Sequence, residues 1–182
     1  MPKEIEGKSA DEWRGDGNAN ISMKNYQEAI NCFEKAVKID PKDKMVWYSL
    51  GSAYFTLKNY QKAIDCYKKV VKIDPKLNVA WYGMGLAYYN LKNYQKAIEC
   101  YEKALKIFYQ HHITFSDPVY VWNNMGEAYN GLKNYRKAIE CYEKALEIDP
   151  NYQIAKNNLK RLEPQRRELE EKHGKNIEEE RK

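Results

Sequence analysis

Cysteine and histidine are the residues of this sequence with the most versatile chemistry, since both bind metals and take part in catalysis. The four cysteines, Cys32, Cys66, Cys100 and Cys141, follow one another at intervals of 34, 34 and 41 residues. Each occupies the same place in a recurring phrase such as IECYEKA, and none belongs to a CxxC pair. This pattern favours a structural role in a repeated unit over a disulfide or a zinc site. Unpaired thiols are typical of a reducing compartment, so we expect a cytoplasmic protein.

The histidines also lack the spacing of a metal site. His111 and His112 are adjacent, so on a helix their side chains point about 100° apart, whereas paired ligands prefer a spacing such as i and i+4. His173 stands alone in a charged segment near the end of the chain. The sequence shows no nucleophile–base pair and no glycine-rich phosphate loop either. We therefore expect no metal, no cofactor and no enzymatic activity.

Composition narrows the class of protein. Of the 182 residues, 43% are apolar and 31% are charged, which is typical of a soluble, helix-rich chain. No run of 18 apolar residues occurs, and the opening MPKEIEGKSADEW lacks the apolar stretch of a secretory signal, so we expect no membrane partner. The net charge of +5 is spread through mixtures of lysine and glutamate. Such a distribution argues against nucleic-acid binding, which needs a basic patch.

The cysteines are positioned by a repeat that runs through most of the chain. Within each unit, apolar residues recur at intervals of three and four, which predicts two helices. Asn59 is a good N-cap for the second helix of its unit, and Pro75 ends that helix. Phrases beginning Lys-Asn-Tyr start at Lys24, Lys58, Lys92 and Lys133, and each follows a segment led by Trp13, Trp47, Trp81 or Trp122.

Each unit is therefore predicted to be a helical hairpin. Small residues, Gly51, Ala53 and Ala63, stand where the two helix backbones must approach closely. A single hairpin cannot bury its own apolar face, so neighbouring hairpins must stack. The predicted fold class is all-α: a right-handed superhelix, or α-solenoid, of antiparallel helical hairpins with a concave inner wall.

The repeated residues resemble a known family. The pattern of Trp47, Leu50, Gly51 and Tyr54, followed by Ala63, Tyr67 and Pro75, resembles the tetratricopeptide repeat, and it recurs four times in register. The resemblance implies a protein–protein interaction scaffold with four repeats. The organisation that follows is a leader over 1–9, an array over 10–152, a capping helix over 153–163 and a charged tail over 164–182. The repeats are 10–43, 44–77, 78–118 and 119–152.

Two parts of the array depart from the pattern. Asp16 and Asn20 stand in repeat one where repeat two has Leu50 and Tyr54, so its first helix is either partly exposed or meets a partner or a second copy. Repeat three is seven residues longer, because Lys72 lies nine residues before its tryptophan and Lys106 lies sixteen before Trp122.

Seven residues make about two helical turns. The insertion resembles the longer repeats of the kinesin light chain type, which lengthen both helices of a hairpin. We expect the second helix of repeat three to continue through Tyr109 toward His112, and Ser116 or Asp117 to cap the next helix with Pro118 in its first turn. A role of the insertion in partner choice stays open.

The resemblance also implies where a ligand binds. In this family the concave groove is lined by the first helix of each hairpin. Transferred residue by residue, the groove has an apolar, aromatic middle and polar ends, although each aromatic side chain can instead pack between neighbouring helices. We expect a peptide or protein segment with apolar side chains as the ligand. The predicted groove residues are Arg14, Asn18, Met45, Tyr48, Ser52, Phe55, Val79, Tyr82, Leu86, Tyr89, Tyr120, Asn123 and Glu127.

Two other functions stay open. Some members of the family clamp the C-terminal carboxylate of heat-shock chaperones. Arg14 and Asn18 match the first pair of clamp positions, but Ser49, Val79 and Gly83 occupy the other three, with no basic residue in repeat three. Chaperone-tail binding is therefore an alternative with little support. The other alternative is a self-associating structural repeat protein without a dedicated ligand.

Overall fold

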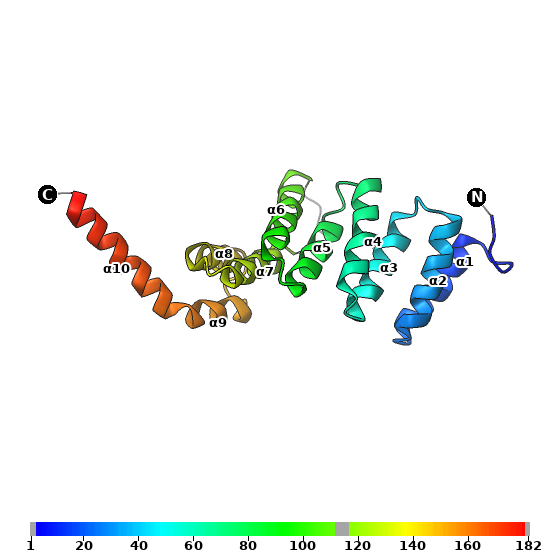
Figure 1. Ribbon diagram of the computed structural model, residues 1–182, viewed down its shortest axis with the longest axis horizontal. Coiled ribbons are helices and arrows are strands. Elements are labelled where there is room, and N and C mark those ends of the chain that lie inside the picture. The colour runs from blue at the N-terminus through cyan, green and yellow to red at the C-terminus, as the bar shows by residue number, and fades with distance from the viewer. Residues whose placement is uncertain (1–2, 112–116, 181–182) are drawn as a thin grey trace. The chain divides into compact units, whose positions relative to one another are not determined.

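The computed structural model describes residues 3–111 and 117–180, with side chains placed as far as residue 171 (Figure 1). The described part of the chain is α-helical and contains no strand, which confirms the all-α prediction. The chain forms two compact units, Met1–Asn93 and Tyr94–Lys182. Among the described residues, no helix combines the length and the apolar character needed to cross a membrane.

The helices pair into hairpins in each unit, as the sequence predicts. In the first unit α1 packs against α2 and α3 against α4, and in the second α7 packs against α8. The first unit contains α1 (Ala10–Ser22), α2 (Tyr26–Ile39), α3 (Lys44–Thr56), α4 (Tyr60–Ile73) and α5 (Asn78–Asn90). The second contains α6 (Tyr94–His111), α7 (Pro118–Gly131), α8 (Tyr135–Ile148), α9 (Gln153–Arg161) and α10 (Glu163–Glu180).

One turn, with the sequence Leu-Lys-Asn in three of its four copies, joins the helices of each hairpin. After α3, the backbone amides of Lys58 and Asn59 donate to the carbonyls of Phe55 and Tyr54, each at 2.8 Å. Closing the helix in this way needs a left-handed residue, and Lys58 takes that conformation with φ of +60°. The Asn59 side chain then accepts from the Lys62 amide at 3.4 Å and caps α4, as predicted.

Close approach of the two helices depends on glycine facing an aromatic ring. A Cβ atom added to Gly51 would lie 2.8 Å from the ring of Tyr67, and one added to Gly126 would lie 2.6 Å from the ring of Tyr142. Both distances are too short for a real contact, so only glycine fits. Tyr67 and Tyr142 are 3% and 0% exposed, which places these rings at the centre of their hairpins.

The tryptophan that leads each repeat is anchored through its indole N–H. Trp47 donates to the carbonyl of Pro41 at 2.9 Å, and Trp81 donates to the carbonyl of Pro75 at 3.1 Å, each six residues earlier. Tyr109 stands 34 residues after Pro75 and so occupies the repeat position that Pro75 has in the repeat before. Because of the insertion, it lies 13 residues before Trp122 instead of six. Its side-chain hydroxyl takes the place of the carbonyl and accepts from Trp122 at 3.2 Å.

Within the described residues, the insertion lengthens α6 more than α7. α6 has 18 residues where α4 has 14, and α7 has 14 where α5 has 13. α6 therefore gains four residues, about one turn, and continues through Tyr109 as predicted. Asp117 caps α7 by accepting from the Val119 amide at 2.9 Å, with Pro118 first in the helix. Residues 112–116, including His112 and Ser116, lie outside the described residues.

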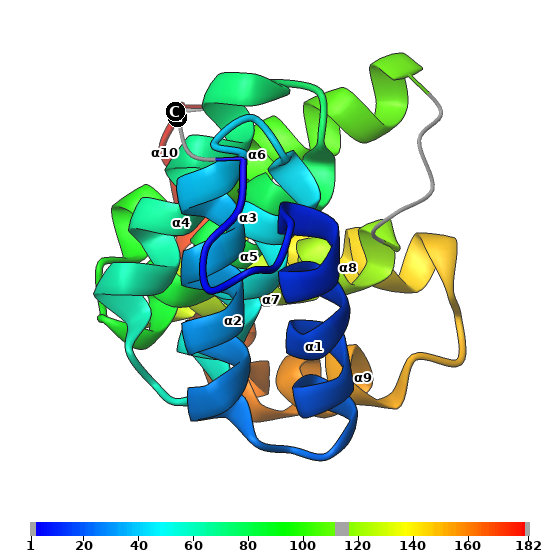
Figure 2. The ribbon, with the colours of Figure 1, turned by 90° about the vertical axis from the view of Figure 1, so that its right-hand side faces the viewer.

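The leader packs against the first hairpin, beside α1 and α2 (Figure 2). The carbonyl of Ile5 accepts from the Trp13 indole at 2.9 Å, and Glu6 pairs with Lys35 at 2.7 Å. The ammonium of Lys8 lies 2.5 Å from the carboxylate of Asp16. The leader therefore supplies the acceptor that a preceding repeat would supply.

Asp16 and Asn20 are both hydrogen-bonded within the chain. Besides the ion pair of Asp16 with Lys8, the side-chain amide of Asn20 donates to the backbone carbonyl of Asp16 at 2.9 Å. Each side chain is partly exposed. These contacts satisfy the polar groups that replace Leu50 and Tyr54 of repeat two, so neither residue needs a partner to be hydrogen-bonded.

The C-terminal helices cover the last hairpin. Ala155 and Leu162 are buried against Ile139 and Tyr142 of α8, so α9 and the residue after it pack on this hairpin. α10 is not simply a solvated tail. Leu169 packs against the same cluster, and Arg166 pairs with Glu143 of α8 at 3.3 Å.

Candidate functional site

The predicted groove residues of the first unit that lie on α3 and α5 share one helix face. Their spacing of three, four and three residues repeats on both helices, so the side chains of each helix line up on one side. α3 and α5 contact each other within this unit. We call this surface the aromatic face, and its residues are Met45, Tyr48, Ser52, Phe55, Val79, Tyr82, Leu86 and Tyr89.

The aromatic face is partly open to solvent. Met45 is 51% exposed, and the other members are half-buried. Tyr48 leans on the ring of Tyr67, with ring centres 5.8 Å apart, and Phe55 meets Tyr60 edge-on at 5.3 Å. These contacts hold the rings of Tyr48 and Phe55 in place, so this part of the aromatic face is ordered. Burial raises the pKa of the Tyr48 hydroxyl above its ordinary value.

The polar positions on α1 are used differently. Arg14 pairs with Asp43 at 3.0 Å and with Asp11 at 2.7 Å. Asp43 is the N-cap of α3, so Arg14 ties α1 to the start of the next repeat. The side chain of Asn18 is exposed. Arg14 is therefore engaged by carboxylates of the chain itself, whereas the Asn18 side chain is open to solvent.

The predicted groove residues on α7 are engaged by the C-terminal cap. The Tyr120 ring meets Tyr152, the N-cap of α9, edge-on at 5.6 Å. Glu127 accepts from Arg161 of α9 at 3.0 Å.

Asn123 is buried, with 4% of its surface exposed, and accepts from Asn158 of α9 at 3.0 Å. The expectation that Asn123 lines an open groove is not met. A buried amide needs a partner within the protein, and the capping helix provides one.

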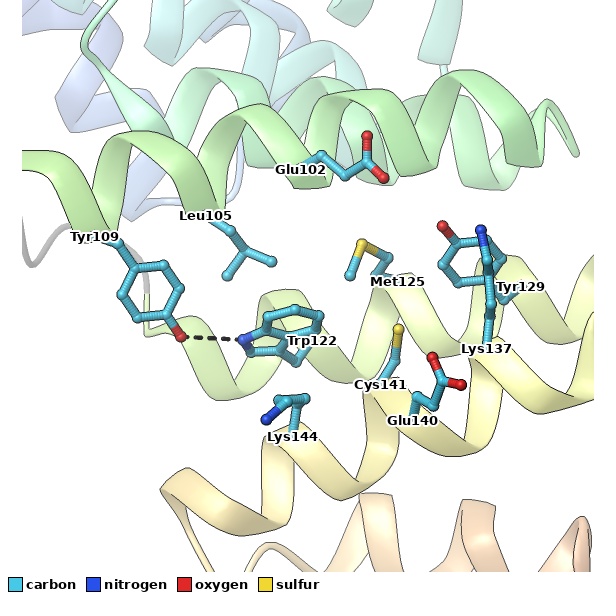
Figure 3. A pocket seen from close by; sticks show the side chains of 10 residues that line it. All are labelled: Glu102, Leu105, Tyr109, Trp122, Met125, Tyr129, Lys137, Glu140, Cys141 and Lys144. Atoms are coloured by element: carbon cyan, nitrogen blue, oxygen red, sulfur yellow. Dashed lines mark hydrogen bonds between the residues drawn. The ribbon is translucent and has the colours of Figure 1, made fainter.

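Each unit also contains a crevice that was not predicted from the sequence. In the second unit, α6 and α8 form the walls, with Trp122, Met125 and Tyr129 of α7 between them (Figure 3). This α6–α8 crevice has a volume of about 410 Å³. Its other lining residues are Glu102, Leu105, Tyr109, Lys137, Glu140, Cys141 and Lys144.

The first unit has an equivalent α2–α4 crevice of about 450 Å³, with Trp47, Leu50 and Tyr54 of α3 as its floor. Its charged lining residues are Glu34, Lys38, Lys62 and Asp65, and all but Lys38 correspond by repeat position to charged residues of the α6–α8 crevice. The signal in the sequence was the repeated Glu, Tyr and Lys at fixed positions. Only the packing of three helices shows that these side chains face one space.

The cysteines next to these crevices are unreactive. All four cysteines are free thiols, as predicted, and all four are buried. Burial, followed by the charge of neighbouring carboxylates, raises the pKa of Cys66 and that of Cys141 to about 12. A thiol that stays protonated is a poor nucleophile and a poor metal ligand.

Comparison with protein families agrees with this geometry. A family model described as tetratricopeptide repeat matches residues 119–152. A second model, described as anaphase-promoting complex, cyclosome, subunit 3, matches residues 22–104. These matches, together with the fold, support a tetratricopeptide-repeat (TPR) family for this chain. No curated protein sequence matches the chain.

Solved structures show the same TPR fold. The crystal structure of MamA aligns with a TM-score of 0.70 and 27% identity over 78% of this chain and 73% of that one. YrrB, titled a TPR protein with an unusual peptide-binding site, aligns with a TM-score of 0.76 and 23% identity over 87% and 78%. The first TPR of Spaghetti (RPAP3), bound to the HSP90 peptide SRMEEVD, aligns with a TM-score of 0.61 and 24% identity over 68% and 93%.

The positions of the TPR carboxylate clamp are not basic in this chain beyond repeat one. Arg14 is occupied by two carboxylates of the chain itself. Gly83 is buried, and a Cβ atom there would lie 2.9 Å from the ring of Tyr67. A longer basic side chain at that position would therefore clash with the core of the hairpin.

Proposed function

We propose that this TPR chain is a protein-interaction scaffold, and that its aromatic face binds a peptide or protein segment with apolar side chains. The observation that carries the proposal is the partial exposure of ordered apolar side chains at repeated positions on α3 and α5. Contiguous exposed apolar surface usually marks an interaction site. The neighbouring structures titled as peptide-binding TPR proteins support the same class of function.

A segment with two or three large apolar side chains suits this surface. Each fully buried side chain contributes about 1.5–3 kcal/mol, and the cost of ordering the segment subtracts from the sum. The expected affinity is therefore roughly micromolar, about −8 kcal/mol. Tyrosine at three of the positions also offers hydroxyl groups, so the ligand backbone can hydrogen-bond along the same face.

The test is selection of a random peptide library on the full chain, followed by binding isotherms of the selected peptides. Met45→Ser and Tyr82→Ala should each weaken the peptides by about tenfold or more, since each removes an anchor worth more than about 1.4 kcal/mol. Met23→Ser is the matched control, because Met23 is 62% exposed but lies at the end of α1. Peptides that bind all three variants equally well would rule out the aromatic face as the site.

A further inference from the structure

The two crevices have floors built from equivalent repeat positions. They differ in whether their acidic side chains are hydrogen-bonded or paired. In the α2–α4 crevice, the Tyr54 hydroxyl donates to Glu34, and Asp65 lies 4.0 Å from Lys68. In the α6–α8 crevice, the equivalent Glu102 and Glu140 form no hydrogen bond or ion pair with any described residue.

Glu102 and Glu140, both solvent-exposed, line the same largely apolar crevice from opposite walls. Glu102 comes from α6 and Glu140 from α8, and Trp122, Met125 and Tyr129 of α7 lie between them (Figure 3). Both carboxylates raise the pKa of the Tyr129 hydroxyl and of the Cys141 thiol, after the larger effect of burial. Their negative charges therefore act on the floor of the crevice itself.

The two lysines that line the crevice do not pair with its two glutamates. Lys144 pairs with Glu147 at 2.8 Å, outside the crevice lining. The Lys137 ammonium lies 5.3 Å from the centre of the Tyr129 ring, in a cation–π contact at one end of the crevice. Neither lysine forms an ion pair with Glu102 or Glu140 in the described structure.

We propose that the α6–α8 crevice is a second docking site, for a partner segment that presents an arginine side chain. The guanidinium would lie between Glu102 and Glu140 and stack on the Trp122 ring, while its alkyl part would contact Leu105 and Met125. Arginine fits better than lysine, because a planar guanidinium stacks on aromatic rings and reaches two carboxylates at once. A purely apolar side chain fits worse, because it would desolvate both carboxylates without pairing them.

This site is independent of the proposed peptide-binding surface. It uses residues of α6, α7 and α8, whereas the aromatic face uses α3 and α5. Loss of binding at one site therefore leaves the other to be tested separately.

The experiment titrates the full, ¹⁵N-labelled chain with N-acetyl-arginine methylamide and follows the indole N–H resonances. The Trp122 resonance, assigned by its loss in Trp122→Phe, should shift and saturate. Trp47, on the floor of the equivalent crevice, is the internal control and should not shift. The citrulline analogue has the same shape without the charge and should give no saturating shift. The lysine analogue should bind more weakly than the arginine probe.

Two variants complete the test. Glu102→Gln and Glu140→Gln should each weaken the arginine probe by about tenfold, since each removes one charge-assisted hydrogen bond. Glu171→Gln, an exposed carboxyl outside the crevice, should change nothing. The proposal is overturned if Trp122 shifts no more than Trp47, if citrulline binds as well as arginine, or if the two glutamine variants bind like the wild type. Thermal unfolding of each variant confirms that it is folded.

Discussion

At the scale of single residues, one hydrogen bond recurs in all four repeats with two kinds of acceptor. The indole N–H of the leading tryptophan always finds an acceptor: the carbonyl of Ile5, of Pro41 or of Pro75, or the hydroxyl of Tyr109. The first three acceptors depend only on the path of the backbone. The fourth depends on a side chain, because the insertion changes the path of the chain before Trp122. Tyr109 is therefore the one acceptor of the four that a conservative substitution can remove.

Tyr109→Phe should destabilise the protein by about 0.5–1.5 kcal/mol, the usual net contribution of a hydrogen bond. Tyr120→Phe is the control, because Tyr120 is similarly exposed, at 49% against 52%, but its hydroxyl has no partner among the described residues. Chemical denaturation of both variants measures the difference. If Tyr120→Phe costs as much as Tyr109→Phe, the bond to Trp122 contributes nothing measurable.

The buried thiols predict a loss of stability at alkaline pH. The pKa of Cys66 and that of Cys141 rise from 9.0 to about 12 on folding, mainly through burial. Because the thiol pKa is higher in the folded chain than in the unfolded chain, the full stability is present below about pH 9. It is lost as the pH rises from 9 toward 12, since the thiols of the unfolded chain ionise first. At pH 10 each cysteine should cost roughly 1 kcal/mol.

Denaturation of the wild type and of the double variant Cys66→Ala, Cys141→Ala at pH 8 and at pH 10 measures this effect. The double variant is expected to lose less stability than the wild type over that interval, whatever its stability at pH 8. Equal losses in the two proteins would mean that the thiols ionise as readily in the folded chain as in the unfolded one.

At the scale of elements, each hairpin depends on a lysine in an unfavourable conformation. Lys24, Lys58, Lys92 and Lys133 all have φ between +58° and +61°. This region costs a residue with a side chain roughly 1–2 kcal/mol. The turn keeps the strain because the amide of the lysine and that of the asparagine after it both donate to carbonyls of the preceding helix.

Lys58→Gly should stabilise the protein by about 0.5–1 kcal/mol, because glycine adopts positive φ without strain. Lys68→Gly makes the same chemical change in the interior of α4 and should destabilise by about 1 kcal/mol. Melting curves of the two variants should therefore move in opposite directions. A drop in stability for Lys58→Gly would show that its side chain contributes more than its backbone strain costs.

At the scale of the whole molecule, the segments before α1 and after α8 contact the hairpins next to them. The leader supplies the acceptor for Trp13 and the partner of Asp16, and α9 supplies the partner of Asn123. A hairpin exposes an apolar edge where no other repeat packs on it, and these segments pack there instead.

Removal of residues 1–8 should loosen the first hairpin and leave the last one unchanged. Stability in a repeat array is close to a sum of repeats and of contacts between neighbours, so the effect should remain local. Hydrogen exchange should become faster for amides in residues 10–39 and stay the same in residues 118–148. A uniform increase along the chain would instead indicate that the array unfolds as a single cooperative unit.

Local features of this protein could be predicted from its sequence. The hairpins, the Asn59 and Asp117 caps, the glycine beneath the ring of Tyr67 and the buried thiols all follow from residues within one repeat. Such features depend on helical periodicity and on hydrogen bonds between residues close in the chain. Four copies of the same pattern strengthen each of these predictions. The extent of the inserted helix was less certain, because seven residues can be divided between helix and loop in several ways.

Contacts between repeats were decided by the tertiary structure. Asn123 was predicted to face a ligand, but it pairs with Asn158, 35 residues away. Glu34 and Glu102 occupy the same repeat position, yet the hydroxyl of Tyr54 binds Glu34, and Glu102 has no such partner. A repeat pattern gives the helix face on which a side chain lies. Whether that side chain is buried, paired or available depends on its neighbours in space, and these differ between the ends and the middle of an array.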